Sequence, residues 1–573
     1  MKVPEQLSSH DRLLLAVVAI TVVAIALRLI GLGQRVAHWD EARVAYFALQ
    51  YANTGIYEYR PITHGPFLHV INGDLVFPLL GASDTSARLI VALIGGLLPA
   101  TALLFRHRLR RWELISMALL LAVTPIILYY SRFMRNDLLL AAFMFAGFGL
   151  LIRYLETRRG RYLYAATAFV ALGFTTKENA IIYLIVWVGA ALLIIDYTAY
   201  RRGFTSIRER MDSIRSTIRE HDPRGRDERH QPVRYVGQAA LAVMIFVTVV
   251  TLFYLPRGPG QIGFFEAFLR PTSLGEVFRT GFIEPLYRGI TSWSPAGEEA
   301  TLYEHYLRQL YNMVDAIVYG ALAIFLLAIL GFFLERYRDQ TREVVMFASY
   351  WGFVSLIGYP LAASVHNPAW LTMHVLIPLA IPAGVALGWI AEGLYSAIRR
   401  EDLLLAAGIS LILMAFGGQL AVAGISGVYL TPASHENPMV QFAQPEDPEL
   451  RAALDDIETA VDDNEGLDIL YYGSPLYDTT GHADAHEVFE TAAFTHRLPL
   501  PWYTLSMDAS VASVQTEAEL TDKLDEEDPP VVISTGQYRH TLDPHLEEHT
   551  VYEVRHFPLS GQNILIYIDE SRR

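Results

Sequence analysis

Asp40 and Glu41 are adjacent carboxylates that directly follow the first long apolar segment of the chain. Charged groups near the hydrocarbon boundary of a membrane are costly unless they have partners or a function. One interpretation is structural: Asp40 caps a helix that begins near Ala42, and Glu41 complements the helix dipole in its first turn. The other is chemical: Asp40 serves as a general base on an acceptor hydroxyl. The two are compatible, because a helix cap would hold the carboxylate rigidly.

Three further charged side chains, Arg132, Arg135 and Asp137, fall within seven residues between two apolar segments. In a structural interpretation, Arg135 pairs with Asp137, and the stem of Arg132 lies along apolar surface while its guanidinium reaches water. In a functional interpretation, the cations hold the phosphate of a lipid-linked sugar. The density of charge in so short a connection favours a function.

Lys177 is one of only three lysines among 45 basic residues, the others being Lys2 and Lys523. In a chain that uses arginine almost everywhere else, this ammonium group is informative, because it is a compact point charge suited to a phosphate. Together with Arg135 it would stabilise the negative charge that grows on a leaving phosphate. Glu178 follows directly and joins the candidate substrate-binding residues.

Histidines form a further set of candidates. His64 and His69 flank a Gly-Pro turn, where imidazoles could bind Zn²⁺ or Mn²⁺, or could instead bond to backbone groups and hold the loop. A divalent metal ion is therefore left open as a cofactor, and none is required by the sequence. His366 and the nearby His374 are candidates for contact with substrate or metal, together with Glu304-His305.

Membrane helices must position these residues, because 52% of the chain is hydrophobic and its mean hydropathy is +0.28. A helix needs about 20 apolar residues to cross the hydrocarbon core. Eleven segments qualify, at 13–33, 88–105, 113–130, 138–155, 162–176, 180–196, 236–255, 312–334, 344–363, 370–396 and 403–427. The expected fold class is mainly α, a polytopic membrane bundle of about 11 transmembrane helices, followed by a C-terminal α/β domain.

Arginines are concentrated in alternate connections between these segments. Because basic loops favour the cytoplasmic side, the pattern predicts a multi-pass plasma-membrane protein with a cytoplasmic N-terminus and an extracytoplasmic C-terminal domain. The outer side then receives the loops 34–87, 131–137 and 256–311, which carry most of the candidate residues. The basic linker 201–234 is expected on the cytoplasmic side, along anionic lipid headgroups.

Residues 429–573 differ sharply in composition from residues 1–428. The tail holds 29 acidic and 7 basic residues, although the net charge of the whole chain is only −15. Strand-like runs at Asp468–Tyr472, Val531–Ser534 and Asn563–Ile568, with a helical run at Pro448–Val461, predict an acidic, soluble α/β domain. Acidic surface and the preference for arginine suit a halophilic organism, although a GC-rich genome would also explain the arginines. No Gly-rich phosphate loop follows a strand, and no nucleic-acid partner is expected.

The order of these motifs resembles the GT-C glycosyltransferases, in particular the protein mannosyltransferase, aminoarabinose transferase and RgtA/B/C/D-like branches. It is most similar to the archaeal flippase-activity-associated family linked to N-glycosylation. The resemblance covers about residues 10–200. Its marks are the acid pair after the first helix, an expected interfacial helix over 42–53 that ends at Gly55, and the segments His64–His69 and Ser86–Leu89.

This resemblance implies that Asp40 is the catalytic base, with Glu41 beside it. It also implies that Arg135 and Lys177 bind the lipid phosphate. Glu178 departs from the family, which has glycine after the lysine, and this places an acid next to the expected phosphate site.

The leading hypothesis is an inverting membrane glycosyltransferase that moves a sugar from a polyprenyl (dolichyl)-phosphate donor to a protein or glycolipid acceptor at the outer membrane face. Asp40 and Glu41 are the candidate catalytic residues. The candidate substrate-binding residues are Arg135, Lys177, His64, His69, Arg132, Asp137, Glu178 and His366. Expected partners are the lipid-linked sugar, membrane lipid, and a glycan or protein acceptor. The alternative is a non-catalytic accessory protein in the flipping of lipid-linked glycans, or a receptor-like module anchored in the membrane.

Overall fold

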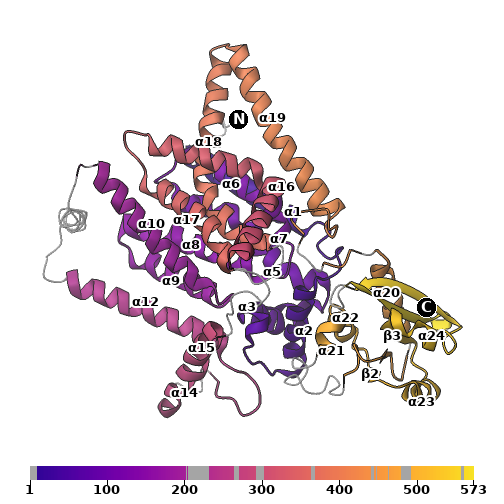
Figure 1. The fold of residues 1–573 in the computed structure, drawn as a ribbon. Helices are drawn as coiled ribbons and strands as arrows, with labels where there is room; N and C mark the ends of the chain where they lie inside the picture. The colour runs from indigo at the N-terminus through magenta and orange to yellow at the C-terminus, as the bar shows by residue number, and fades with distance from the viewer. Residues whose placement is uncertain are drawn as a thin grey trace, which may run out of the picture.

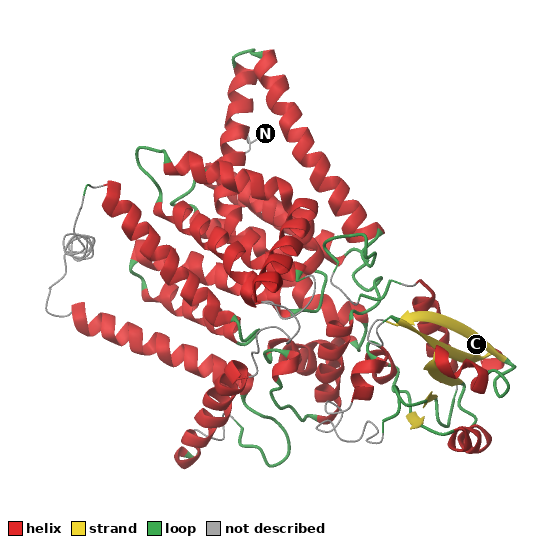
Figure 2. Ribbon diagram, in the orientation of Figure 1, coloured by secondary structure: helices red, strands yellow, loops and turns green. Residues whose placement is uncertain are grey.

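The computed structural model describes residues 9–201, 203, 231–263, 270–291, 302–362, 368–440, 444–446, 448–462, 464–478, 492–556 and 561–572. Most of the predicted linker 201–234 and the candidate His366 lie outside this part of the chain. The described residues form a helical bundle with a small sheet domain at one end (Figures 1 and 2). The prediction of a mainly α membrane bundle with a C-terminal α/β domain is confirmed.

Nine helices in the described residues are long and apolar enough to cross a membrane. They are α1 (Ser9–Leu29), α5 (Asp84–Leu97) with its 3₁₀ continuation η3 (Leu98–Phe105), α8 (Asn136–Thr157), α10 (Ala180–Arg201), α12 (Gln231–Tyr254), α16 (Leu302–Arg336), α17 (Glu343–Gly358), α18 (Met373–Arg399) and α19 (Leu403–Gly424). The chain is a multi-pass membrane protein.

The two other predicted spans are helical but are not among the nine long helices. The segment 113–130 is divided into α6 (Arg111–Val123) and α7 (Pro125–Tyr130), because Thr124 takes the extended conformation that a following proline favours. The segment 162–176 forms α9 (Gly160–Phe174), of 15 residues. Of the eleven expected spans, nine are long helices within the described chain and two are shorter helical segments.

Helix α18 lies at the centre of the bundle and packs against α16, α6 and α17. Its neighbours approach closely because glycines face it: a Cβ on Gly331 would lie 1.8 Å from the carbonyl oxygen of Pro382. Small residues at such crossings let helix backbones meet inside a membrane, where dispersion and close packing drive association. From the far end of α18, the α18–α19 hairpin extends beyond the rest of the bundle (Figure 1).

The arginine-rich connections gather at the end of the bundle remote from the sheet domain. Arg342 pairs with Glu113 at 2.6 Å and with Glu335 at 2.6 Å, and Arg110 reaches Glu392 at 3.5 Å. These pairs join α6, α16, α17 and α18. The alternation of basic connections read from the sequence therefore corresponds to one physical end of the molecule.

The C-terminal domain contains a five-stranded sheet in the order β2-β1-β3-β5-β4. Its strands are β1 (Ile469–Tyr472), β2 (Val511–Val514), β3 (Val531–Thr535), β4 (His549–His556) and β5 (Gln562–Asp569). Strand β1 pairs in parallel with β2 and β3, whereas β5 runs antiparallel to β3 and β4. The helices are α20 (Pro448–Asp462), α21 (Ala492–Arg497), α22 (Leu500–Ser506), α23 (Glu517–Glu527) and α24 (Arg539–Leu542). Three strands and α20 fall where the sequence predicted them.

The segment between α1 and α5 carries the acid pair and joins the two parts of the molecule. It contains α2 (Trp39–Thr54), η1 (Pro61–Thr63), α3 (Phe67–Ile71), the π-helical η2 (Asn72–Val76) and α4 (Phe77–Leu80). As predicted, α2 ends at Gly55, which takes the left-handed conformation with φ of 69°. The helix expected here as interfacial is largely buried, and it packs against α22 of the C-terminal domain (Figure 1).

Candidate active site

Glu41 is a buried carboxylate at the start of α2, paired with two arginines. Its side chain is 2% exposed and accepts two bonds from Arg88, each 2.9 Å long. Arg35 pairs with it at 2.8 Å, and the backbone N–H groups of Met134 and His38 donate to it at 2.7 and 3.0 Å. Burial alone would raise the pKa of Glu41, but Arg35 and Arg88 hold it well below its ordinary value. The carboxylate thus stays ionised and joins α2, α5 and the segment 131–135.

The cap of α2 differs from the sequence interpretation. His38 is the N-cap, and its ring accepts a hydrogen bond from the N–H of Asp40 at 3.0 Å. Glu41 completes a capping box by accepting from the N–H of His38. Asp40 lies inside the first turn, and the cap assigned to it is provided by its neighbours. Its carboxylate is therefore available for another role.

The Asp40 carboxylate contacts two guanidinium groups. Arg43, one turn along α2, donates to its Oδ1 at 2.7 Å, and Arg135 bonds its Oδ2. The side chain of Asp40 is 13% exposed, in contrast to the sealed Glu41. Adjacent residues of a helix point in different directions, so the two acids enter different surroundings. Asp40 is the more exposed carboxylate of the pair.

Asp137 gathers the cations of this end of the bundle. It is 1% exposed, and its carboxylate bonds Lys177 Nζ at 2.8 and 3.0 Å, Arg135 Nε at 3.0 Å and His374 Nε2 at 3.2 Å. Arg135 therefore bridges Asp40 and Asp137, while its guanidinium lies 3.9 Å from the ring centre of Trp370. Burial lowers the pKa of Lys177, and Asp137 only partly opposes this. The cations are held in place before any substrate binds.

His374 supports Asp137 from inside the bundle. It is completely buried in α18, and its Nδ1 lies 2.6 Å from the hydroxyl of Tyr183 on α10. The ring of Tyr359 stacks on it at 4.4 Å between centres. A tyrosine at one ring nitrogen and a carboxylate at the other hold the imidazole in one orientation. This arrangement joins α8, α10 and α18 beneath the charged cluster.

Glu178 and His64 form a second pair beside the cluster. His64 Nδ1 lies 3.2 Å from Glu178 Oε2, and the hydroxyl of Tyr59 donates to Oε1 at 2.8 Å. Burial would raise the pKa of Glu178, but the bond from His64 lowers it. The acid that departs from the family pattern is therefore held by its own partners, away from the carboxylate that holds Lys177.

Backbone contacts bring the His64–His69 loop against the Lys177 loop. The N–H of Gly65 donates to the carbonyl of Thr176 at 3.0 Å, and that of Phe67 donates to Thr175 at 2.9 Å. A Cβ on Gly65 would lie 2.3 Å from the Thr175 carbonyl oxygen, so only glycine allows this approach. The Gly-Pro turn thus has a structural purpose in the site.

His69 is buried beside Tyr57, with 5.9 Å between ring centres. Burial lowers its pKa to about 4, so the ring is neutral at physiological pH. Within the described ranges no group of three or more His, Asp or Glu side chains is gathered as a metal site. The divalent metal ion stays an untested prediction.

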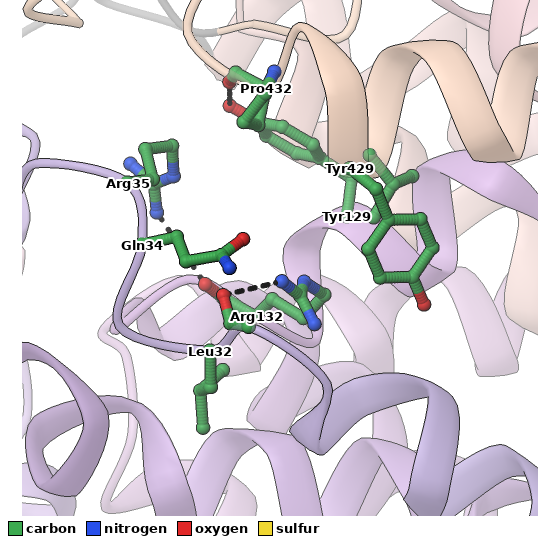
Figure 3. A pocket seen from close by; sticks show the side chains of 9 residues that line it. Leu32, Gln34, Arg35, Tyr129, Arg132, Tyr429 and Pro432 are labelled. Atoms are coloured by element: carbon green, nitrogen blue, oxygen red, sulfur yellow. Dashed lines mark hydrogen bonds between the residues drawn. The ribbon is translucent and has the colours of Figure 1, made fainter.

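Arg132 lies apart from the Asp40–Lys177 cluster, and its guanidinium does not snorkel to water. It is 9% exposed and donates to carbonyl oxygens at the end of α1, namely those of Arg28 at 3.0 Å, Gly31 at 2.9 Å and Ile30. A pocket of about 20 Å³, the size of one water molecule, adjoins it (Figure 3). The lining residues are Gly31, Leu32, Gln34, Arg35, Tyr129, Arg132, Val428, Tyr429 and Pro432. In this structure Arg132 caps α1.

The structure thus brings Asp40, Arg135, Asp137, Lys177 and His374 into one connected cluster. Glu178, His64 and His69 lie beside it on the contacting loops described above. Sequence reasoning missed the direct partners Arg43, Arg35 and Tyr183, and it noted Arg88 only as part of the Ser86–Leu89 segment. The signal available for them was weak, although an ionisable or polar group near a membrane span is a functional candidate by default.

Two family models match separate parts of this chain. Residues 64–206 match dolichyl-phosphate-mannose-protein mannosyltransferase, and residues 450–569 match the Agl23 flippase-associated protein C-terminal domain. The first match includes Arg135, Asp137 and Lys177. A comparison with curated protein sequences found no match.

The fold is shared with ArnT, a protein of known structure. ArnT from Cupriavidus metallidurans in the apo state is 16% identical and matches with a TM-score of 0.52, covering 96% of this chain and 97% of that one. The same protein bound to undecaprenyl phosphate has a TM-score of 0.54 with the same identity and coverage. The archaeal oligosaccharyltransferase AglB from Archaeoglobus fulgidus is 14% identical, with a TM-score of 0.47 over 98% of this chain and 75% of that one.

The bundle therefore shares the fold of ArnT. With the two family segments, this relates the chain to the GT-C glycosyltransferases and, more narrowly, to the Agl23 flippase-associated family. The resemblance inferred from the sequence motifs is confirmed.

Proposed function

We propose that this protein is an inverting glycosyltransferase that uses a polyprenyl-phosphate sugar donor and a protein or glycolipid acceptor. The observation that carries the proposal is the chain of contacts from Asp40 through Arg135 and Asp137 to Lys177. It places one accessible carboxylate beside two cations at the end of an apolar bundle. A lipid-phosphate sugar needs cations at its phosphate, a carboxylate near its sugar carbon, and an apolar surface along its hydrocarbon chain.

The proposed reaction is a single displacement. The acceptor hydroxyl oxygen attacks the anomeric carbon of the sugar, and Asp40 takes the hydroxyl proton. The bond between that carbon and the phosphate oxygen breaks, and its electron pair stays on the polyprenyl phosphate. Arg135 and Lys177 stabilise the negative charge that develops there. The attack from the opposite face inverts the configuration at the anomeric carbon.

In this structure, Asp40 and the cations are joined to one another. Arg135 bonds Asp40 through a terminal guanidinium nitrogen and Asp137 through Nε. A phosphate can therefore replace Asp40 without releasing Arg135 from Asp137. Exchange of this kind would leave Asp40 with Arg43 and open one of its oxygens to an acceptor. Donor binding would then prepare the base. Glu41, sealed among its partners, is assigned the role of holding α2 in place.

Several comparisons support the choice of donor. The fold is shared with ArnT, which is known in a structure bound to undecaprenyl phosphate, and the matched family of residues 64–206 is named for dolichyl-phosphate-mannose.

We assign the site to the extracytoplasmic face of the plasma membrane, because the basic connections lie at the opposite end of the bundle.

A second candidate function is an accessory role in the flipping of lipid-linked glycans. It is favoured by the match of residues 450–569 to the flippase-associated C-terminal domain. In that case the cations would bind the lipid phosphate without any transfer of sugar.

One experiment separates the two candidates. The purified full-length protein is reconstituted in vesicles that contain a radiolabelled polyprenyl-phosphate sugar and a lipid or peptide acceptor. The proposal expects label to move to the acceptor, with inverted anomeric configuration. Movement of the donor between leaflets without transfer, across a range of acceptors, would refute the glycosyltransferase and favour the accessory role.

A further inference from the structure

The C-terminal domain is bound to the short loop that leads into Asp40. Arg451 donates to the carbonyl of Gly33 at 3.4 Å, and the amide of Gln444 donates to the carbonyl of Val36 at 3.0 Å. The hydroxyl of Tyr503 accepts from the N–H of Ala37 at 2.7 Å. The tail therefore bonds this loop at three points within five residues.

One carboxylate at the start of α5, that of Asp84, accepts hydrogen bonds from three residues of the C-terminal domain. Asp84 accepts from Trp502 Nε1 at 2.9 Å, from the Tyr503 hydroxyl at 2.9 Å and from Arg451 at 3.1 Å. Asp84 is buried, at 9% exposed. Because the Tyr503 hydroxyl accepts from Ala37 and donates to Asp84, it bridges the loop to the first turn of α5.

A second path runs from the tail to the acid pair. The Gln444 side chain accepts from Arg35, whose guanidinium also pairs with Glu41 at 2.8 Å. Farther along α2, the ring of Phe494 packs on Tyr46 with 5.0 Å between centres. The start and the middle of α2 are thus both bound by residues from the C-terminal domain (Figure 1).

We propose that the C-terminal domain is a positioning element for Asp40, and that Tyr503 and Gln444 are its positioning residues. The inference rests on the proposed function, in which Asp40 is the base. On the side of the membrane bundle, this loop is held by Arg88, which donates to the carbonyls of Leu32 and Arg35, and by the pair of Arg35 with Glu41. The tail supplies the restraint from the other side. It therefore sets where the carboxylate stands relative to a donor held by Arg135 and Lys177.

The test compares two hydroxyl deletions in the same domain. Tyr503→Phe removes the bridge between Ala37 and Asp84. Tyr567→Phe, the matched control, removes a hydroxyl that bonds Asp543 within the sheet domain, at 2.7 Å. Both variants are prepared as full-length protein, and sugar transfer is measured over a range of polyprenyl-phosphate donor concentrations, so that kcat and the KM for the donor are obtained separately.

A displaced base lowers kcat without weakening the cations that hold the phosphate. Tyr503→Phe is therefore expected to lower kcat about 10- to 100-fold, with the KM for the donor unchanged. Tyr567→Phe is expected to match the wild type. Equal kcat in the two variants, or a rise in donor KM without a change in kcat, would overturn the positioning role.

Coupling to Asp40→Asn distinguishes positioning from general damage. If Tyr503 acts through Asp40, Tyr503→Phe adds no further loss in the Asp40→Asn background, because the group it positions is gone. An additive loss would refute the inference. If Asp40→Asn itself leaves transfer unchanged, the proposed base fails instead, which is a separate result. Should Tyr503→Phe not fold, Gln444→Met carries the same comparison, since it removes the bonds to Arg35 and Val36.

Discussion

Replacing Glu41 by glutamine tests whether this acid is structural or chemical. The substitution keeps the shape of the side chain but removes its charge. In the native protein the carboxylate accepts from Arg88, Arg35 and two backbone N–H groups at 2.7 to 3.0 Å. An amide offers one oxygen to these donors and turns its own N–H₂ group toward the rest. Two buried guanidinium groups would then lack their counter-charge.

The expected loss is large, because removal of one partner from a buried ion pair costs about 3–5 kcal/mol. A matched control is Glu392→Gln, whose pair with Arg110 at 3.5 Å is partly exposed. Such surface pairs contribute about 0–1 kcal/mol. Thermal unfolding in mild detergent should therefore show a fall of several degrees for Glu41→Gln and little change for the control.

The pH dependence of this stability has a defined sign. The folded-state pKa of Glu41 lies well below its ordinary value, because Arg35 and Arg88 outweigh the effect of burial. Its contribution is therefore complete above the ordinary glutamate pKa of about 4.3 and is lost as the pH falls toward the folded-state value. Glu41→Gln should remove this acid sensitivity. A variant that unfolds like the wild type yet has lost all transfer would refute the structural role and make Glu41 a catalytic candidate.

Three further outcomes are expected. Asp137→Asn should raise the donor KM and should cost about 3–5 kcal/mol of folding stability, which would be seen as a lower thermal midpoint. A wild-type KM would contradict the assignment of Arg135 and Lys177 to the phosphate. Lys177→Arg should extend donor binding to higher pH, because burial lowers the lysine pKa while arginine stays charged; an unchanged alkaline limit would count against Lys177 as a phosphate ligand. Gly65→Ala should lower both midpoint and transfer, since its Cβ would lie 2.3 Å from the carbonyl oxygen of Thr175, whereas Gly189→Ala has open space and should be neutral.

Much of the membrane fold could be predicted because hydropathy and arginine placement report directly on the bilayer. The span predicted over 113–130 was overestimated because Pro125 divides its apolar run into two helices, whereas the run predicted over 162–176 forms the equally short, 15-residue α9. The burial of α2 could not be predicted, since aromatic residues on a helix suit lipid and protein equally. The contact with α22 (Leu500–Ser506) decides between lipid and protein, and it lies more than 440 residues further along the chain.

The candidate site was predicted in its members more fully than in its connections. Asp40, Arg135 and Lys177 stood out by residue type and place. The different roles of Asp40 and Glu41 could not be predicted in this way, because they depend on which arginine each acid meets. Glu41 meets Arg88, and Asp40 meets Arg43. Pairings of this kind are set by tertiary packing and leave no local pattern.

The central claim is that Asp40 is the general base for sugar transfer from a polyprenyl-phosphate donor. It is tested most directly by measuring transfer with Asp40→Asn in the purified full-length protein, alongside binding of the donor. We expect transfer to fall about 10²- to 10⁴-fold, the usual contribution of a general base, while the donor still binds through Arg135 and Lys177. Unchanged transfer by a folded Asp40→Asn protein would contradict the account.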